Sequence, residues 1–187
     1  QSDEKKASLA NWKLKMGDKI ADQIRDRAAA RGTAMHTYLE HYLDGTGYKD
    51  LTTLGKQAEV MANKIIEAGL GDLEELWGLE TTLYYPDLYA GATDVVGVYA
   101  GQPAIIDFKQ SNKPKRREWI MDYFEQLGAY AMAHNQVYGT KIQSGIVLMC
   151  TKDFLFQKFE VSGREFVRHQ HAFLRKVDQY YKNVSQA

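Results

Sequence analysis

Residues 91–117 read Gly-Ala-Thr-Asp-Val-Val-Gly-Val-Tyr-Ala-Gly-Gln-Pro-Ala-Ile-Ile-Asp-Phe-Lys-Gln-Ser-Asn-Lys-Pro-Lys-Arg-Arg, and this stretch decides the fold. Two segments rich in Val, Ile and aromatic residues flank Ala100-Gly101, a pattern typical of a β-hairpin. A turn centred between these two residues sets Asp94 opposite Asp107. Directly opposed side chains on paired strands have Cβ atoms about 4.5–5.5 Å apart. The hairpin therefore predicts two carboxylates close together.

The same register pairs Val96 with Ile105 and predicts which side chains share a face of the sheet. Lys109 lies two residues beyond Asp107, and successive side chains of a strand point to opposite faces. We therefore expect Lys109 on the face that carries both carboxylates. Two acids and a lysine grouped this closely are unfavourable as structure alone and suit a divalent-metal site. The hairpin thus indicates the centre of a nuclease.

The composition bounds the class of protein. The chain has 187 residues, of which 44% are hydrophobic and 26% charged, as expected for one globular domain. Its 24 basic and 24 acidic residues balance, which argues against a protein that coats nucleic acid by bulk charge. No apolar run approaches the roughly 18 residues of a membrane span, and no signal peptide is visible. The single cysteine, Cys150, excludes an internal disulfide, is expected in a buried strand, and fits a reducing compartment.

Hydrophobic periodicity predicts that the chain begins with helices. Helical spacing covers residues 1–31, whose apolar stripe consists of Trp12, Met16, Ile20 and Ile24. Arg31-Gly32-Thr33 interrupts the pattern, and Thr33 is the expected N-cap of a second helix that ends near Gly45. The predicted buried side of this second helix consists of Met35, Leu39, Tyr42 and Leu43.

Strands and helices then alternate. The further predicted elements are a helix over 51–68, a strand over 77–85, the hairpin, a helix over 119–138, strands over 142–150 and 154–161, and a last helix that includes 166–180. This order predicts an α/β fold with a mixed β-sheet flanked by helices. We expect a single domain over 1–187, with a helical part over 1–75 and a sheet core over 76–187.

Hydrolysis of a phosphodiester bond requires a cation that neutralises phosphoryl oxygens and lowers the pKa of the attacking water. Mg²⁺ prefers oxygen ligands and keeps several waters, so two carboxylates supply enough protein charge. We expect Asp94 and Asp107 to hold Mg²⁺, with Mn²⁺ as a substitute and the backbone carbonyl of Phe108 as a further ligand. Lys109 would orient or deprotonate the metal-bound water. In the structural alternative, Lys109 only forms a salt bridge with Asp107 on an exposed face.

The spacing from Asp94 to Ile105-Ile106-Asp107-Phe108-Lys109 resembles that of the PD-(D/E)xK nuclease superfamily. Two further motifs are similar to those of its RecB-like branch, namely Arg31-Gly32-Thr33-x-x-His36 upstream and Gln126-x-x-x-Tyr130 downstream. The run Ile-Asp-Phe-Lys-Gln-Ser-Asn-Lys-Pro-Lys is similar to the mitochondrial genome maintenance exonucleases and their phage and bacterial relatives. Gln110 departs from the pattern, since these relatives usually have Thr after the lysine, which leaves substrate contacts there open.

The resemblance implies a restriction-endonuclease-like fold with a helical N-terminal part, and it assigns roles to four more residues. His36 would be a metal ligand, although a histidine at the edge of an apolar stripe is often structural. Glu80 would bind the metal through water or contact the lysine, or it is an ordinary strand residue. Gln126 and Tyr130 would contact the lysine or a DNA phosphate, or they are a satisfied core amide and a packing tyrosine.

The segment after the lysine is basic and has no acidic residue between 109 and 117. We expect Lys113, Lys115 and Arg116, together with Ser111, to bind the phosphate backbone of DNA. Single-stranded DNA or DNA ends as substrate, and an exonuclease activity, follow from the resemblance alone. The alternatives are a structure-selective or flap endonuclease on the same fold, and a nucleic-acid-binding module without catalysis.

Cellular location and assembly are less constrained by the sequence. A reducing compartment fits bacterial cytoplasm or a phage-infected cell, and also a mitochondrial matrix. Nothing in the charge or the periodicity requires an oligomer, so a monomer is the default expectation. Cleavage polarity, the choice between DNA and RNA, and the number of metal ions stay open.

Overall fold

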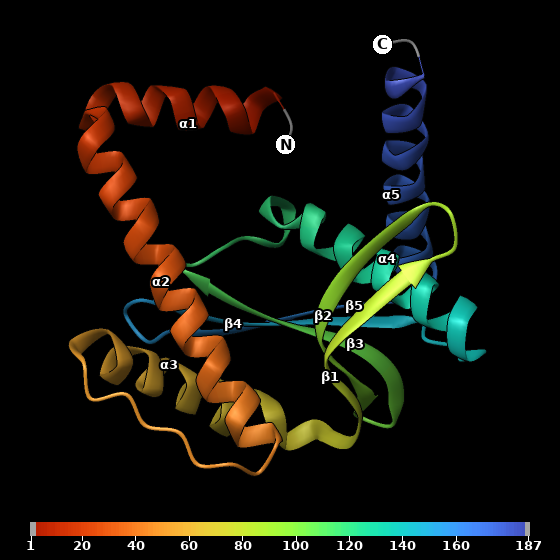
Figure 1. Cartoon of the computed structure of the whole chain (residues 1–187), viewed down its shortest axis with the longest axis horizontal. Helices are drawn as coiled ribbons and strands as arrows, with labels where there is room; N and C mark the ends of the chain where they lie inside the picture. Colours follow the sequence, from red (N-terminus) through yellow and green to blue (C-terminus); the bar gives the residue numbers. More distant parts are fainter. Residues whose placement is uncertain (1–2, 186–187) are drawn as a thin grey trace.

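A five-stranded mixed sheet forms the centre of the computed structural model, which describes residues 3–185 (Figure 1). Its strands lie in the order β1-β2-β3-β4-β5, and only the β3·β4 pair is parallel. The strands are β1 (Leu73–Tyr85), β2 (Tyr89–Tyr99), β3 (Gln102–Ser111), β4 (Ser144–Thr151) and β5 (Phe156–Ser162). The helices are α1 (Asp3–Met16), α2 (Asp18–Leu43), α3 (Thr53–Gly69), α4 (Met121–Tyr138) and α5 (Gly163–Val184), with 3₁₀ turns η1 (Leu70–Asp72) and η2 (Arg117–Trp119).

The predicted hairpin is confirmed. Ala100 and Gly101 both have positive φ, 48° and 75°, as the two central residues of a tight type I′ turn require. Val96 pairs with Ile105 as expected. The parallel strand β4 is reached through α4, because parallel neighbours need a crossover connection. The mixed α/β fold predicted from the order of elements is therefore the observed one.

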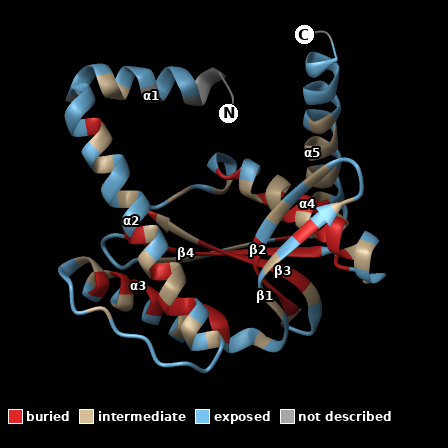
Figure 2. Cartoon of the chain, viewed as in Figure 1, coloured by how far each residue is buried: buried red, intermediate tan, exposed pale blue. Residues whose placement is uncertain are grey.

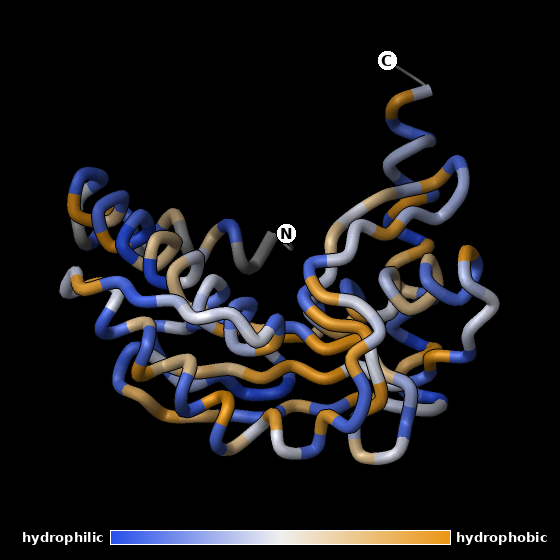
Figure 3. Tube along the Cα trace, turned by 60° about the horizontal axis from the view of Figure 1, so that its bottom comes forward, coloured by the Kyte–Doolittle hydropathy of each residue, from blue (hydrophilic) through white to orange (hydrophobic). Residues whose placement is uncertain are grey.

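The sheet is covered on both faces, and this arrangement follows from the period-2 alternation of its central strands. Ile106 faces α2 and α3 and packs with residues such as Met35 and Ile65. Its neighbour Ile105 faces the opposite side and packs beneath α4 and α5, with Phe124 among its partners. Buried residues concentrate along the central strands and the inner sides of these helices (Figure 2), where hydrophobic residues also gather (Figure 3).

Two predictions about the N-terminal helices are wrong. Thr33 is not an N-cap, because α2 runs without interruption from Asp18 to Leu43, and the Thr33 hydroxyl donates to the carbonyl of Ala29 at 3.2 Å. The chain breaks instead at Gly17, where φ is 81°. Tyr42 was expected in the core and is 54% exposed, whereas Tyr38, one turn earlier, is 8% exposed.

Trp12, Ile20 and Ile24 of the predicted apolar stripe do not belong to either core cluster, and the side chain of Met16 lies outside the described part of the chain. Ile20 is 52% exposed, and α1 with the first turns of α2 projects away from the sheet (Figure 1). The long α2 continues from this exposed part down to the sheet, where it carries His36 onto the face of β3. Within residues 3–185, the structure has no helix long and apolar enough to span a lipid bilayer.

Candidate active site

Acidic side chains of neighbouring strands lie side by side at one end of the β2–β3 pairing. The pairs of that ladder end at Val95 opposite Ile106, which places the next residues, Asp94 and Asp107, adjacent to each other. Both residues are buried, at 9% and 4% exposure. The structure thus brings together the two carboxylates expected from the hairpin.

Asp94 bridges two other elements of the site. Its Oδ2 accepts a hydrogen bond of 2.6 Å from the backbone N–H of Phe108 on β3. Its Oδ1 lies 3.4 Å from Nδ1 of His36 on α2. The carboxylate is therefore held in position from the sheet while its second oxygen faces the histidine.

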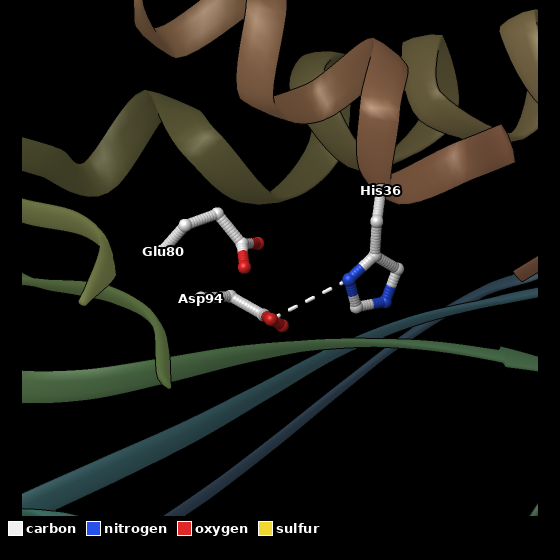
Figure 4. Close-up of side chains that lie close together, drawn as sticks. All are labelled: His36, Glu80 and Asp94. Carbon is white, nitrogen blue, oxygen red and sulfur yellow. Dashed lines mark ion pairs between the residues drawn. The ribbon is translucent and has the colours of Figure 1, made fainter. Parts of the chain in front are cut away.

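The ring of His36 is oriented by the backbone of β3. Its Nε2 lies 2.9 Å from the carbonyl of Phe108, and because a carbonyl only accepts, this nitrogen carries the proton. Nδ1 then faces Asp94 (Figure 4). Burial by itself lowers the pKa of His36, but the hydrogen bond to Asp94 and the negative charges of Asp94 and Asp107 outweigh it, so the pKa is raised.

Glu80 completes a cluster with His36 and Asp94. It lies on β1 between the pairs that join that strand to β2, which sets it across from Asp94. One ligand atom from each of the three residues lies within 4.8 Å of the others, and the side chains converge on one point (Figure 4). Glu80 has a φ of 48°, an unfavourable conformation for a residue with a side chain. Burial and the charge of Asp94 raise the pKa of Glu80.

Asp107 and Lys109 form an ion pair beside this cluster, on the same face of β3. Burial raises the pKa of Asp107 to about 6, although the Lys109 charge opposes the shift. For Lys109, burial acts to lower the pKa, but the charge of Asp107 outweighs it and the pKa is raised. Lys109 is therefore an ammonium ion at neutral pH. Its Nζ lies 5.3 Å from the centre of the Tyr123 ring.

Gln126 and Tyr130 lie one turn apart on α4 and contact each other. The amide Nε2 of Gln126 donates to the Tyr130 hydroxyl at 2.8 Å. Burial raises the pKa of Tyr130, and the charges of Asp107 and Lys109 act on its hydroxyl as well. The Tyr130 ring packs on the backbone of Gly91, where an added Cβ would lie 2.8 Å from the ring.

Three of the four residues expected to bind DNA lie in one groove. Ser111, Lys113 and Lys115 line a depression of about 750 Å³ beside α2. The Ser111 hydroxyl donates to the carbonyl of Lys113 at 2.6 Å, which shapes the loop after β3. Arg116 does not line this groove; it lies over the Trp119 ring at 5.2 Å and 4.0 Å from Glu118.

Two residues of this region had no role assigned from the sequence. Tyr123 contacts Lys109, yet in the sequence it falls within an aromatic stripe that reads as core. Arg31 lies inside the motif that contains His36. The sequence placed it at an expected helix break, and nothing in its pattern predicted that its side chain lines the groove. Gln110, noted only as a departure from the family pattern, contacts Arg31 at 3.0 Å.

Comparison with known proteins gives partial matches in sequence. No family model matches the chain. It is 34% identical over 90 residues to mitochondrial genome maintenance exonuclease 1 of Homo sapiens, and 32% identical over 90 residues to the Xenopus tropicalis protein of that name. Each match covers 45% of this chain, and the chain spans about a quarter of the length of these relatives, 26% and 25%.

A solved structure shares the fold. The crystal structure of a "Putative exonuclease" from Eubacterium rectale superposes with a TM-score of 0.57 at 14% sequence identity, over 83% of this chain and 66% of that one. At this identity the likeness concerns the fold alone. It agrees with the five-stranded mixed sheet flanked by helices described above.

Proposed function

We propose that the chain is a metal-dependent deoxyribonuclease that removes nucleotides from the ends of single-stranded DNA. The observation that carries this proposal is the convergence of His36, Glu80 and Asp94 beside the buried Asp107–Lys109 ion pair. Both curated relatives are named as exonucleases, which supports a nuclease and favours cleavage from an end.

The donor atoms of the cluster fit a divalent cation. Two carboxylates and one imidazole nitrogen lie within 4.8 Å of one another. The two carboxylates carry like charge at short range, and a cation between them would remove this repulsion. Burial, and after it the same repulsion from Asp94, raises the pKa of Glu80. Carboxylates suit Mg²⁺ and Mn²⁺, whereas imidazole binds Mn²⁺ more readily than Mg²⁺. We therefore propose that either ion supports activity, held by His36, Glu80, Asp94 and Asp107.

The protonation of His36 is consistent with a ligand role. Its Nε2–H donates to the Phe108 carbonyl, so Nδ1 is the nitrogen that faces the carboxylates. A metal-binding histidine commonly donates its other N–H to a carbonyl or carboxylate, which fixes the ring and its tautomer. We assign the Phe108 carbonyl to this orienting role in place of the direct ligand role expected from the sequence.

When bound, the metal would supply positive charge to the phosphoryl oxygens and an acidified water. The residues of the chain have separate tasks. Lys109 is protonated because Asp107 raises its pKa, so it donates hydrogen bonds to the attacking water or the phosphate and stabilises charge there. Asp107 keeps the ammonium group beside the cluster. Gln126 fixes the Tyr130 hydroxyl, which we assign to a scissile-phosphate contact.

End-labelled oligonucleotides test the proposal. Single- and double-stranded substrates are incubated with Mg²⁺ or Mn²⁺, and product lengths are resolved over time. A ladder that shortens from one end of the single strand supports the proposal, while absence of cleavage with both ions overturns it. A circular single strand serves as the second substrate, because an exonuclease leaves it intact and an endonuclease linearises it.

Metal affinity should increase as the pH rises through about 6. Asp107 has a pKa of about 6 in the metal-free protein, and its bound proton competes with the cation below that pH. The raised pKa of His36 acts in the same direction. Calorimetric titration with Mn²⁺ at several pH values measures the effect and the protons released. An affinity that does not change across this range contradicts the assignment of these two groups as ligands.

Gly91→Ala should disturb the site from outside the cluster. The new Cβ would lie 2.8 Å from Cε1 of Tyr130 and 3.3 Å from its hydroxyl, so the ring must move and its bond to Gln126 breaks. Overpacking of this kind costs about 1–3 kcal/mol in the free energy of unfolding, measurable by denaturant titration, and cleavage should fall with it. Gly71→Ala is the control, since nothing lies within 4 Å of its added Cβ. Equal stability of both variants would contradict the packing described here.

A further inference from the structure

The guanidinium of Arg31 is held on β3 and the residue after it by two neutral acceptors. Arg31 is 7% exposed. Its Nε donates to Oε1 of Gln110 at 3.0 Å, and its Nη2 donates to Oδ1 of Asn112. Gly32 makes room for this contact, because a Cβ there would lie 3.1 Å from Cγ of Gln110. The arginine is therefore fixed in direction by side chains that carry no charge.

No carboxylate in the described part of the chain pairs with this cation. Among the described residues, no ion pair joins Arg31 to an acidic side chain, and Nη1 has no hydrogen-bond partner. The acidic group whose charge acts on the Arg31 guanidinium is Asp153, which is itself paired with Lys152 at 2.9 Å. A buried charge without a counter-ion is unfavourable, so this arrangement favours an anion supplied from outside the chain.

The surroundings of Arg31 select the kind of anion. Among the side chains that the structure describes, the wall of the groove of about 750 Å³ that Arg31 lines has no acidic member, although the whole chain has a net charge of zero. Its basic side chains are Arg27, Arg31, Lys113, Lys115 and Lys152. Trp12 and Tyr123 add aromatic rings to the same wall. A positive groove with aromatic side chains is the usual surface for an unpaired nucleic acid strand.

The groove also leads to the proposed catalytic centre. Gln110 directly follows Lys109 on β3, and Tyr123 both lines the groove and lies beneath the Lys109 ammonium. A DNA strand in the groove that contacts Arg31 would therefore lie close to Lys109, because Lys109 directly precedes the Gln110 that holds Arg31.

We propose that Arg31, positioned by Gln110 and Asn112, binds a backbone phosphate of single-stranded DNA next to the one that is cleaved. This inference rests on the proposed function for the location of the cut, but not for the binding itself. Gln110 and Asn112 engage two of the five guanidinium N–H groups, and the Nη1 pair is directed at the phosphate. Gln110 thus serves as a positioning residue at the place where the family resemblance breaks down.

Binding of labelled oligodeoxythymidine without metal, in EDTA, tests the subsite independently of cleavage. Arg31→Met keeps the length of the side chain and removes the charge, and replacement of a buried charge by an apolar group is compatible with folding. We expect affinity to fall roughly tenfold or more, because hydrogen bonds to charged groups are the stronger class. The slope of log affinity against log salt should decrease by about 0.7, the value for one phosphate contact on a single strand. Arg31→Lys should restore the slope but only part of the affinity.

Arg25→Met is the matched control. Arg25 lies on the exposed side of the same helix and pairs with Asp22 and Asp26 at 3.1 and 3.0 Å. Its replacement should leave the DNA affinity and the salt slope unchanged. Equal affinity of the Arg31→Met and Arg25→Met proteins overturns the inference. An equal loss on duplex DNA of the same length overturns the assignment to single strands. Oligonucleotide binding that depends on Arg31, in a protein that cleaves nothing with Mg²⁺ or Mn²⁺, would refute the proposed function and leave the subsite standing.

Discussion

Lys109→Ala should reduce DNA cleavage by roughly 10²–10⁴-fold, the range expected when a group that acts on the transition state is removed. The Lys109 ammonium lies at Asp107, and both its charge and its hydrogen bonds are lost in alanine. DNA binding should persist, because the groove cations beyond β3 are unchanged. Single-turnover cleavage and binding in EDTA, measured on the same preparation, separate the two effects.

Lys158→Ala offers a control with nearly the same contacts elsewhere in the fold. The Lys158 ammonium pairs with Asp72 at 3.3 Å and lies 5.3 Å from the Tyr99 ring, as the Lys109 ammonium lies 5.3 Å from Tyr123. Loss of an ion pair and a ring contact is therefore common to both variants, and only Lys109→Ala should lose activity. Full cleavage by the Lys109→Ala protein would remove this lysine from the mechanism.

Asp94→Asn should abolish metal binding as well as cleavage. The substitution keeps an oxygen that accepts from the Phe108 N–H and removes the negative charge that faces His36. Groups that merely support metal ligands contribute about 10–100-fold to affinity, so loss of a ligand should exceed this range. Calorimetry with Mn²⁺ measures binding, and end-labelled DNA measures cleavage.

Asp87→Asn is the control for that substitution. Asp87 lies in the exposed turn between β1 and β2 with a φ of 62°, a conformation that asparagine also tolerates. The Asp87→Asn protein should bind Mn²⁺ and cleave DNA as the unchanged protein does. If Asp94→Asn retained the metal with unchanged affinity, the cluster of His36, Glu80 and Asp94 could not be the metal site.

The fold was largely predictable because its main signals are local. The turn at Ala100-Gly101 and the alternation around it determine the register, and both act within a few residues of sequence. The break at Gly17 and the unbroken α2 were not predictable in the same way. Gly32 and Thr33 interrupt a helix by propensity, but packing of the following turns on the sheet outweighs that cost.

The candidate site was predictable where it depends on register and unpredictable where it depends on backbone irregularity. Asp94 and Asp107 follow from the hairpin. The conformation of Glu80 depends on a positive φ within β1, which no period reveals. Arg31 is held by Gln110 and Asn112, about 80 residues away in sequence, and a pattern within one helix carries no information on such a pairing.

The end of the β2–β3 ladder has a consequence for how the sheet itself is built. Beyond Val95 and Ile106 the backbone pairing of β2 with β3 ends, while β2 stays paired with β1 and β3 stays paired with β4. Across this fork, the side chain of Asp94 accepts the Phe108 N–H in the position where a backbone carbonyl would otherwise stand. One carboxylate therefore joins the two parts of the sheet where their backbone pairing has ended. The chemistry is proposed to occur beside this side chain, where the two strands separate.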